Sequence, residues 1–308
     1  MLKVAVVGVG VMGSHHARIY SSLNICELVG VLDVDSERAK EVAKMYGVQP
    51  FTRIDDLLSL KPDAVSIAVP TSLHREVSLK FLERGVSCLV EKPIASTPED
   101  AELMISSARK HGATLMVGHI ERFNPAVSRL KDLLSSGEVG QVLSLYAKRA
   151  GPFDPRIRDV GIITDLMTHD IDVVRFLVGK EPIEVHAVYG RYGREVEDYA
   201  SILLDFGGII ATLEANRFTP YKIRNLAVTG SDGVALLDYI GQTIDICRKD
   251  STIGTGRKIE VKKDEPLRIE IEHFLDCVRS GRRPLVDGEE GLKNLKIAME
   301  ALRCGGAR

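Results

Sequence analysis

The feature that most constrains the fold is an alternation, over about the first 120 residues, of short uniformly apolar runs with segments patterned as helices. The runs are Val4–Val7, Leu28–Leu32, Ala64–Val69, Val86–Val90 and Leu115–Val117. Strands that are apolar on both faces belong to parallel sheets that helices cover on each side. This part of the chain is therefore predicted to be a doubly wound α/β domain.

The pattern changes near residue 120. From Val142 onward the strands alternate apolar and polar residues, as in Ala200–Phe206 and Ile209–Arg217. Such alternation is typical of an antiparallel sheet with helices on one face only. We therefore expect two domains, residues 1–120 with the parallel sheet and residues 121–308 with a mostly antiparallel open sheet. The last helix is free to pack back on the first domain.

Composition narrows the classes of partner. Lys and Arg number 41 and Asp and Glu 43, which gives a formal charge of −2 and argues against a general nucleic-acid binder, although a local basic pocket stays open. No run approaches the ~20 apolar residues of a membrane span, and the N-terminus opens directly into a strand pattern. The five scattered cysteines lack metal-ligand spacing. We expect a cytoplasmic protein with no nucleic acid, membrane or metal.

A glycine-rich loop follows the first predicted strand. Residues 8–13 read Gly-Val-Gly-Val-Met-Gly and open a predicted helix. Gly8 permits a tight turn, Gly10 lets the backbone approach a pyrophosphate, and Gly13 allows close packing of the helix, whose N-terminus adds free N–H groups. A turn without a ligand is the alternative, but strand, loop and helix in this order favour a Rossmann domain. The predicted cofactor-binding residues of the loop are Gly8, Gly10, Val11, Met12 and Gly13.

An acidic residue, Asp33, ends the second predicted strand, twenty residues after Gly13. A carboxylate at this place accepts hydrogen bonds from an adenosine ribose and repels a 2′-phosphate, which favours NAD over NADP. Arg38 lies nearby in the sequence. It belongs either to the outer face of a helix or to the cofactor site, where it would soften that preference, so NADP stays open.

Charged residues stand where a buried sheet should end. Glu91, Lys92 and Pro93 follow an apolar strand, and ligands of open parallel sheets bind outside such strand ends. A functional lysine and an ion pair at the end of the strand both fit this pattern.

Asp165 and His169 are four residues apart on a predicted helix and share one face. They are either a pair facing a cleft or a core histidine with its partner; a metal site lacks a third ligand.

Two further polar segments are candidates for substrate binding. One follows the last strand of the first domain and contains Arg122 and Asn124. The other is a loop rich in Pro and Arg that contains Arg156 and Arg158. Arginine forks bind carboxylates and phosphates, so this loop is predicted to bind a substrate anion. A surface loop held by an Arg–Asp pair is the alternative.

Together these motifs resemble the glucose–fructose oxidoreductase/inositol dehydrogenase (Gfo/Idh/MocA) family over the whole chain. The matching elements are Gly8–Gly13, Pro70–His74, Glu91–Pro93, Gly118–Pro125 and Asp165–Asp172. The Lys-Pro and Asp-x-x-x-His elements are far more specific than the glycine loop. The resemblance implies a Rossmann domain that binds NAD(P), a second α/β domain with an open sheet, and a substrate between them.

The resemblance also implies roles for single residues. Lys92 looks like the lysine near the nicotinamide and the reacting hydroxyl. Asp165 and His169 look like the helix pair that faces it, with His169 as the proton acceptor. The remaining positions implied to line the cofactor are Val69, Thr71, His74 and Glu91. The glycine cluster that usually precedes the aspartate is reduced to Gly161 here, which leaves the shape of the pocket wall open.

Within the family the Arg-rich loop looks most like that of a branch acting on nucleotide sugars. The implied activity is hydride transfer between NAD and a sugar or UDP-sugar, with UDP-N-acetylglucosamine 3-dehydrogenation as its best match and inositol or free-sugar oxidation as the alternative. A biliverdin- or imine-reducing enzyme would not need Lys92, Asp165 and His169. A regulator that binds NAD without turnover is the non-enzymatic alternative. The free face of the second sheet suggests a homodimer or homotetramer.

Overall fold

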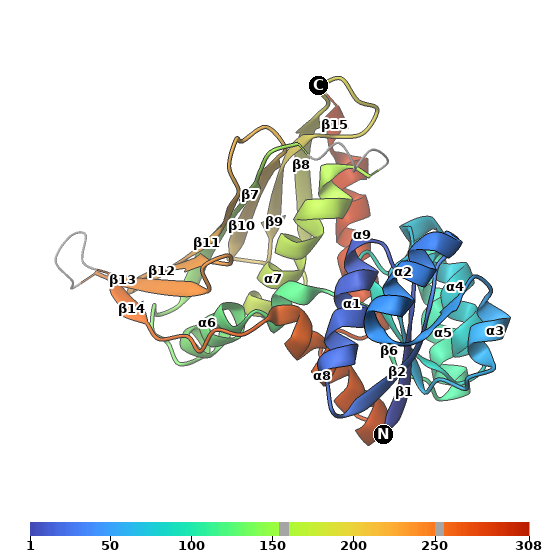
Figure 1. The fold of residues 1–308 in the computed structure, drawn as a ribbon. Helices are drawn as coiled ribbons and strands as arrows, with labels where there is room; N and C mark the ends of the chain where they lie inside the picture. Colours follow the sequence, from blue (N-terminus) through green and yellow to red (C-terminus); the bar gives the residue numbers. More distant parts are fainter. Residues whose placement is uncertain (154–159, 250–255, 308) are drawn as a thin grey trace. The chain divides into compact units, whose positions relative to one another are not determined.

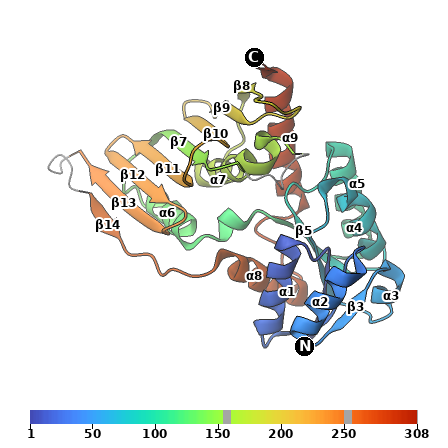
Figure 2. The same ribbon diagram turned by 45° about the horizontal axis from the view of Figure 1, so that its top comes forward.

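The computed structural model describes residues 1–153, 160–249 and 256–307 (Figures 1 and 2). The chain forms two compact units, each with its own sheet. The first comprises Met1–His119 and Leu267–Leu295, and the second comprises Ile120–Pro266 and Lys296–Arg308. In the described ranges no helix is both long and apolar enough to cross a bilayer.

The first unit is built on a six-stranded parallel sheet of order β3-β2-β1-β4-β5-β6. Its strands are β1 Leu2–Val7, β2 Cys26–Leu32, β3 Gln49–Phe51, β4 Ala64–Ile67, β5 Ser87–Glu91 and β6 Leu115–Gly118. The strand order reverses between β1 and β4, which opens a crevice at their carboxyl ends. The structure confirms the predicted doubly wound α/β fold.

Helices cover both faces of this sheet because right-handed crossovers run in opposite directions from its centre. They are α1 Val11–Ser22, α2 Ser36–Tyr46, α3 Ile54–Leu58, η1 Thr71–Leu73, α4 His74–Leu82, α5 Pro98–His111, α8 Pro266–Ser280 and the start of α9 Gly288–Cys304. Their ends follow local chemistry. The Asp35 carboxylate caps α2 by accepting hydrogen bonds from the N–H groups of Glu37 and Arg38, and Gly112 closes α5 with φ of 68°.

The C-terminal helices are distributed differently from the expected division at residue 120. The sequence predicts residues 121–308 as the second domain, with the last helix free to pack back on the first, and Leu267–Leu295, which contains most of α8 and the start of α9, belongs to the first unit. The edge strand β6 holds this segment, because the Val117 N–H donates to the Val286 carbonyl at 2.9 Å. A helical pattern shows that one face is buried but does not show against which sheet, so the sequence left this assignment open.

The second unit contains a sheet that, in its described part, has nine strands in the order β14-β13-β12-β11-β7-β10-β9-β8-β15. These are β7 Val142–Ala150, β8 Glu184–Gly190, β9 Tyr199–Asp205, β10 Ile210–Asn216, β11 Ile223–Gly230, β12 Gly233–Asp238, β13 Thr243–Arg248, β14 Arg257–Ile259 and β15 Gly306–Ala307. The pairs are antiparallel except β7 with β10 and β8 with β15. This confirms the predicted mostly antiparallel open sheet.

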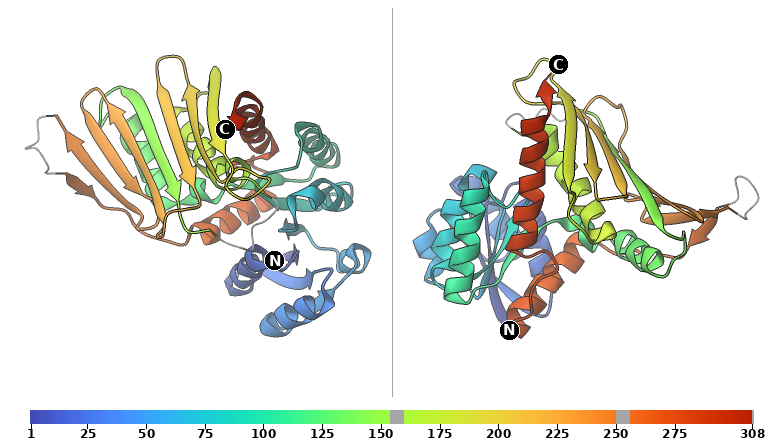
Figure 3. Two further views of the ribbon diagram at one scale, coloured as in Figure 1. Left: turned by 90° about the horizontal axis from the view of Figure 1, so that it is seen from above. Right: turned by 180° about the vertical axis from the view of Figure 1, so that it is seen from behind.

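Helices pack on one face of this second sheet, and Figure 3 shows the other face bare of them. They are η2 Ile120–Phe123, α6 Pro125–Ser135, η3 Ile163–Met167, α7 Thr168–Val178 and the end of α9. The sequence predicts one α-helix from about Ile163 to Leu177, but η3 is a π-helical turn. Such wide turns occur often at functional sites. On the bare face Tyr146, Leu203 and Leu236 are exposed.

Gly13→Ala is expected to destabilise the first unit. A Cβ at this position would lie 1.8 Å from the carbonyl oxygen of Gly8, so the backbone would have to move. Overpacking of this kind costs about 1–3 kcal/mol. Gly10→Ala is the matched control, since nothing lies within 4 Å of its added Cβ. Thermal unfolding followed by circular dichroism measures both variants, and equal melting temperatures would contradict the packing argument.

Candidate active site

The glycine loop forms a close-packed turn between β1 and α1. Gly8 has φ of +83°, and a Cβ there would lie 2.7 Å from the carbonyl oxygen of Ala68, so this position requires glycine. Gly13 packs directly on the backbone of Gly8. Open space surrounds the Cα of Gly10. The first turn of α1 can therefore be approached closely by a ligand, as its free N–H groups require for binding an anion.

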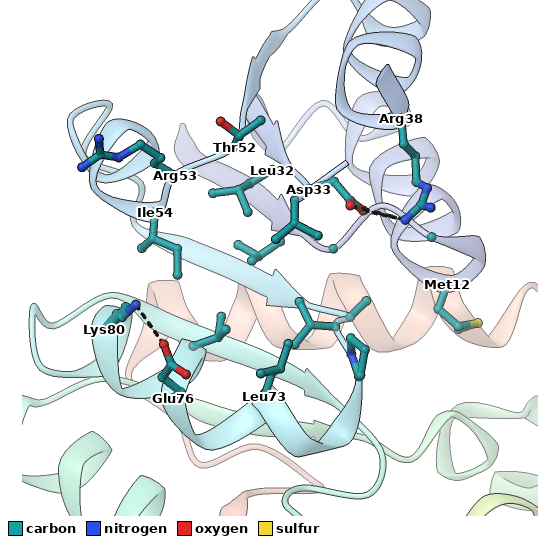
Figure 4. A pocket seen from close by; sticks show the side chains of 18 of the residues that line it. Met12, Leu32, Asp33, Arg38, Thr52, Arg53, Ile54, Leu73, Glu76 and Lys80 are labelled. Carbon is teal, nitrogen blue, oxygen red and sulfur yellow. Dashed lines mark hydrogen bonds and ion pairs between the residues drawn. The ribbon is translucent and has the colours of Figure 1, made fainter. Parts of the chain in front are cut away.

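A pocket of about 780 Å³ lies at the carboxyl ends of the strands of the first unit (Figure 4). Several of the predicted cofactor-binding residues line it, namely Gly8, Gly10, Met12, Asp33, Arg38 and Val69. Val11 and Gly13 belong to α1 and do not line the pocket. The pocket has the size of a cofactor site, and the sequence-predicted ribose acid stands in its wall.

The Asp33 carboxylate is fixed by backbone and side-chain donors. It accepts hydrogen bonds from the N–H of Val9 at 2.9 Å and from the N–H of Asp35 at 3.0 Å. Arg38 Nη1 lies 3.3 Å from both carboxylate oxygens, and Figure 4 shows the two side chains pointing toward each other. Arg38 thus belongs to the pocket and not only to the outer face of α2. The glycine cradle and this oriented carboxylate fit a dinucleotide.

Several lining residues are not among the predicted site residues. They are Thr52, Arg53, Ile54, Leu73, Glu76 and Lys80. Thr52 and Arg53 follow the short strand β3, and Glu76 and Lys80 form an ordinary ion pair on α4, with Nζ 3.1 Å from Oε1. They meet at the pocket because parallel strands end at one edge of the sheet. Only the strand order, which the sequence did not give, could have identified them.

A chain of buried hydrogen bonds lies behind the end of β5. Glu91 Oε1 contacts His16 Nε2 at 2.9 Å, His16 Nδ1 contacts Ser66 Oγ at 2.9 Å, and Tyr20 Oη contacts the same Ser66 oxygen at 2.8 Å. Burial acts to raise the pKa of Glu91, but the hydrogen bond from His16 and the charges of His16 and Lys92 outweigh it and lower the pKa. Glu91 is thereby an internal anchor and does not line the pocket.

The other predicted residues after β4 and β5 are Lys92, His74 and Thr71. Lys92 follows β5 and is partly buried. His74 is buried, and its ring nitrogens lie 2.9 Å from the Pro93 carbonyl oxygen and 3.0 Å from that of Val69. Burial lowers the pKa of His74. His74 therefore ties together the loops after β4 and β5, whereas Thr71 begins η1 outside the lining of the pocket.

In the second unit, Asp165 and His169 flank the junction between η3 and α7. Both are partly buried. Arg217, at the end of β10, donates from Nη2 to Asp165 Oδ2 at 2.9 Å, and its side chain is almost fully buried. Arg217 was not predicted, because its partner lies far away in the sequence. The ion pair holds the Asp165 carboxylate against the end of the sheet.

Behind this pair lies a buried network of ion pairs. Arg149 donates to Asp170 at 2.9 and 3.0 Å and to Glu121 at 3.1 Å. Arg122 donates to both oxygens of Asp172, at 2.8 Å each. All of these side chains are buried. The guanidinium of Arg122, which the sequence predicts as a substrate-binding residue, is held by Asp172 inside the unit, and its role toward a substrate stays a prediction.

Asn124 is also internal. Its side chain caps α6 by accepting a hydrogen bond from the N–H of Ala126, and its amide donates to Glu121 and to the Tyr239 carbonyl. These bonds account for Asn124 without a substrate. Arg156 and Arg158, the other predicted substrate residues, lie outside the described residues. Among the residues that are described, no group of His, Cys, Asp and Glu is arranged to hold a metal ion.

Comparison with known proteins agrees with this architecture. Residues 2–119 match the model of an oxidoreductase family with an NAD-binding Rossmann fold, and residues 127–236 match the GFO/IDH/MocA C-terminal domain. The chain is 33% identical to a UDP-N-acetylglucosamine 3-dehydrogenase of Acidithiobacillus ferrooxidans, over 97% of this chain and 96% of that one. A solved structure of that enzyme superimposes with a TM-score of 0.91, covering 99% and 97% of the two chains.

A second group of relatives consists of proteins named as inositol dehydrogenases. The scyllo-inositol 2-dehydrogenase (NAD(+)) of Bacillus subtilis is 28% identical over 97% of this chain and 93% of its own. The two family models together cover most of both units. The chain belongs to the GFO/IDH/MocA family of oxidoreductases, and its first unit is an NAD-binding Rossmann domain.

Proposed function

We propose that the protein oxidises a ring hydroxyl of a nucleotide sugar with NAD, and that UDP-N-acetylglucosamine, oxidised at C3, is its substrate. The observation that carries this proposal is the 33% identity, over nearly the whole of both chains, to a UDP-N-acetylglucosamine 3-dehydrogenase. The chain also contains Lys92, Asp165 and His169, which are the residues that the chemistry needs.

The proposed reaction removes a hydride from the ring carbon and a proton from its hydroxyl. NAD, when bound, accepts the hydride. His169 takes the proton, since an imidazole exchanges protons near neutral pH. The Lys92 ammonium group donates a hydrogen bond to the hydroxyl oxygen and stabilises the negative charge that develops there. Asp165, held by Arg217, orients His169 and the substrate.

His169→Ala is expected to lower turnover of UDP-N-acetylglucosamine by ~10²–10⁴-fold, because the reaction loses its proton acceptor. NAD affinity is expected to stay unchanged, since the pocket residues of the first unit are untouched. NADH absorbance measures turnover and fluorescence titration measures NAD binding. His111→Ala is the matched control, because His111 is exposed at the end of α5 and its ring contacts the Ser107 carbonyl of the same helix at 3.0 Å. Wild-type turnover in His169→Ala would remove His169 from the mechanism.

An inositol or free-sugar dehydrogenase is the second candidate, favoured by the 28% identity to a scyllo-inositol 2-dehydrogenase over 97% of the chain. The two candidates differ in the substrate that gives turnover. UDP-N-acetylglucosamine, scyllo-inositol and myo-inositol are to be compared by kcat/KM under one set of conditions with NAD. A higher kcat/KM for either inositol would replace the first proposal by the second.

Asp33→Ala is expected to weaken NAD binding and to relax discrimination against NADP. The change removes the ribose hydrogen bonds and leaves Arg38 with Asp35 as its carboxylate partner, close to where a 2′-phosphate would bind. A hydrogen bond to a charged group contributes about 1.5–3 kcal/mol, so the ratio of kcat/KM for NAD to that for NADP is expected to fall about 10- to 100-fold. Arg38→Ala on the same background is expected to remove the gain with NADP. An unchanged ratio in Asp33→Ala would exclude Asp33 from the ribose site.

We also propose that the bare face of the second sheet joins copies of this chain into a homodimer or homotetramer. One row across this face places Leu203, Thr212, Tyr146, Ala227 and Leu236 side by side. Leu203 and Leu236 are 39% and 46% exposed, so the row offers apolar area that a second copy would bury.

Free thiols at all five cysteines support the proposal that the protein is cytoplasmic, because thiols stay reduced in that compartment.

Leu236→Lys is expected to shift the protein to a smaller species, because a lysine in the row would be buried without a partner. Analytical ultracentrifugation measures the mass. The melting temperature of the dissociated chain is expected to follow protein concentration less steeply than that of the assembly. Ile183→Lys is the control, since Ile183 is exposed but precedes β8. The same mass in Leu236→Lys and wild type would place the interface elsewhere.

A further inference from the structure

Three strand ends of the second unit meet at one edge of its sheet. The carboxyl ends of β7 and β10 lie together because these strands are parallel, and Asn216 pairs with Ala150. The start of β11 joins them because it runs antiparallel to β7, with Ile223 opposite Ala150. Side chains at these ends therefore surround a common space, and η3 packs beside β10.

A cavity of about 160 Å³ occupies that space. The charged residues that line it are Arg149, Arg217, Lys222, Arg224 and Asp165. A water molecule takes roughly 30 Å³ in the liquid, so the cavity has room for one small group, such as a phosphoryl or carboxylate group, but not for a nucleotide. Four of these five residues are cations and one is an acid.

Two of these four cations form ion pairs with carboxylates. Arg149 is bound by Asp170 and Glu121, and Arg217 by Asp165. For Lys222 and Arg224, by contrast, the described residues supply no carboxylate within ion-pair distance. Among the described residues, no carboxylate therefore competes at ion-pair distance with an anionic ligand for Lys222 or Arg224, although Glu121, Asp170 and Asp165 attract Arg224 from farther away.

The sheet register adds a cost to this arrangement. Arg224 on β11 stands directly opposite Arg149 on β7, and like charges at opposed positions destabilise a sheet. Burial and the charge of Arg149 lower the pKa of Arg224, although nearby carboxylates, Glu121 among them, act in the other direction. Two arginines opposite each other do not stabilise the fold. Residues that are kept in spite of such a cost are typical of functional sites, and this pair lies beside Asp165.

We propose that this cavity binds an anionic group of the substrate through Arg224 and Lys222, and that the group is a phosphoryl of the nucleotide sugar. The proposal rests on the proposed function and deepens it. A guanidinium fork and an ammonium group together match a phosphoryl group in geometry and charge. A sugar carboxylate offers the same chemistry, so the experiment separates these two sources. Asp165, which is paired with Arg217 and belongs to the proposed mechanism, lines this subsite.

The test is a titration of the NAD-loaded, full-length enzyme with UDP, with inorganic pyrophosphate and with D-glucuronate. Isothermal titration calorimetry compares wild type with Arg224→Gln, Arg224→Lys and Lys222→Gln. Lys263→Gln is the matched control, because Lys263 is exposed and does not line the cavity. Arg224→Gln is expected to weaken UDP and pyrophosphate binding about 10- to 100-fold, the loss for hydrogen bonds to a charged group. Arg224→Lys is expected to recover part of it.

A folding readout separates a binding role from a structural one. Arg224→Gln removes the like-charge pair with Arg149, so its melting temperature is expected to equal or exceed that of wild type. A lower melting temperature would mean that Arg224 is structural and would overturn the proposal. Wild-type affinity of Arg224→Gln for both UDP and pyrophosphate would overturn it as well. Loss of glucuronate binding alone would overturn the phosphoryl assignment in favour of a carboxylate.

Failure of the subsite and failure of the proposed function give different results. If wild type oxidises UDP-N-acetylglucosamine and Arg224→Gln has the wild-type KM, the function stands and the subsite falls. If wild type does not oxidise this sugar but pyrophosphate binding still depends on Arg224, the subsite stands and the substrate is another phosphorylated compound. A raised KM in Arg224→Gln, with a smaller effect on kcat, supports both.

Discussion

The buried guanidinium of Arg149 is the interaction on which the candidate site of the second unit depends. Removing an arginine from water costs several kcal/mol unless partners replace the solvent. Here Asp170 and Glu121 do so, and the ring of Tyr239 lies under the guanidinium with its centroid 5.1 Å from Cζ. Three separate elements, β7, η2 and α7, are thereby joined at one point. Because Asp170 directly follows His169, the network also fixes the start of α7.

The same network explains why the site can hold further charge. Burial raises the pKa of Asp170, although the charge and hydrogen bonds of Arg149 act against it. The two carboxylates around Arg149 exceed it by one charge, and their attraction also reaches Arg224. This residual attraction makes a second arginine tolerable on the neighbouring strand without pairing it. Glu121 and Asp170 therefore attract Arg224 from within the unit, and its guanidinium can still contact a ligand in the cavity.

The sequence predicted those parts of the molecule that rest on local chemistry. The turn at Gly8, the helix that begins after it and the carboxylate of Asp33 depend on residues close together in the chain, and Gly8 and Asp33 line the pocket of the first unit. The roles of Lys92, Asp165 and His169 stay predictions. Arg122 shows the limit of such reasoning, because an arginine near a strand end suits a ligand or a buried acid equally well. Its partner, Asp172, is fifty residues away.

Register and strand order decided the rest. The opposition of Arg149 and Arg224 arises from the pairing of β7 with β11, which are more than seventy positions apart, and no local pattern announces it. The net charge of −2 likewise conceals how charge is arranged. Buried arginines that form ion pairs with carboxylates hold the elements of the unit together and do not point to a ligand. Cations that face a cavity without a bound carboxylate mark a place where solvent or substrate must complete the pairing, and here that place borders the carboxylate of Asp165.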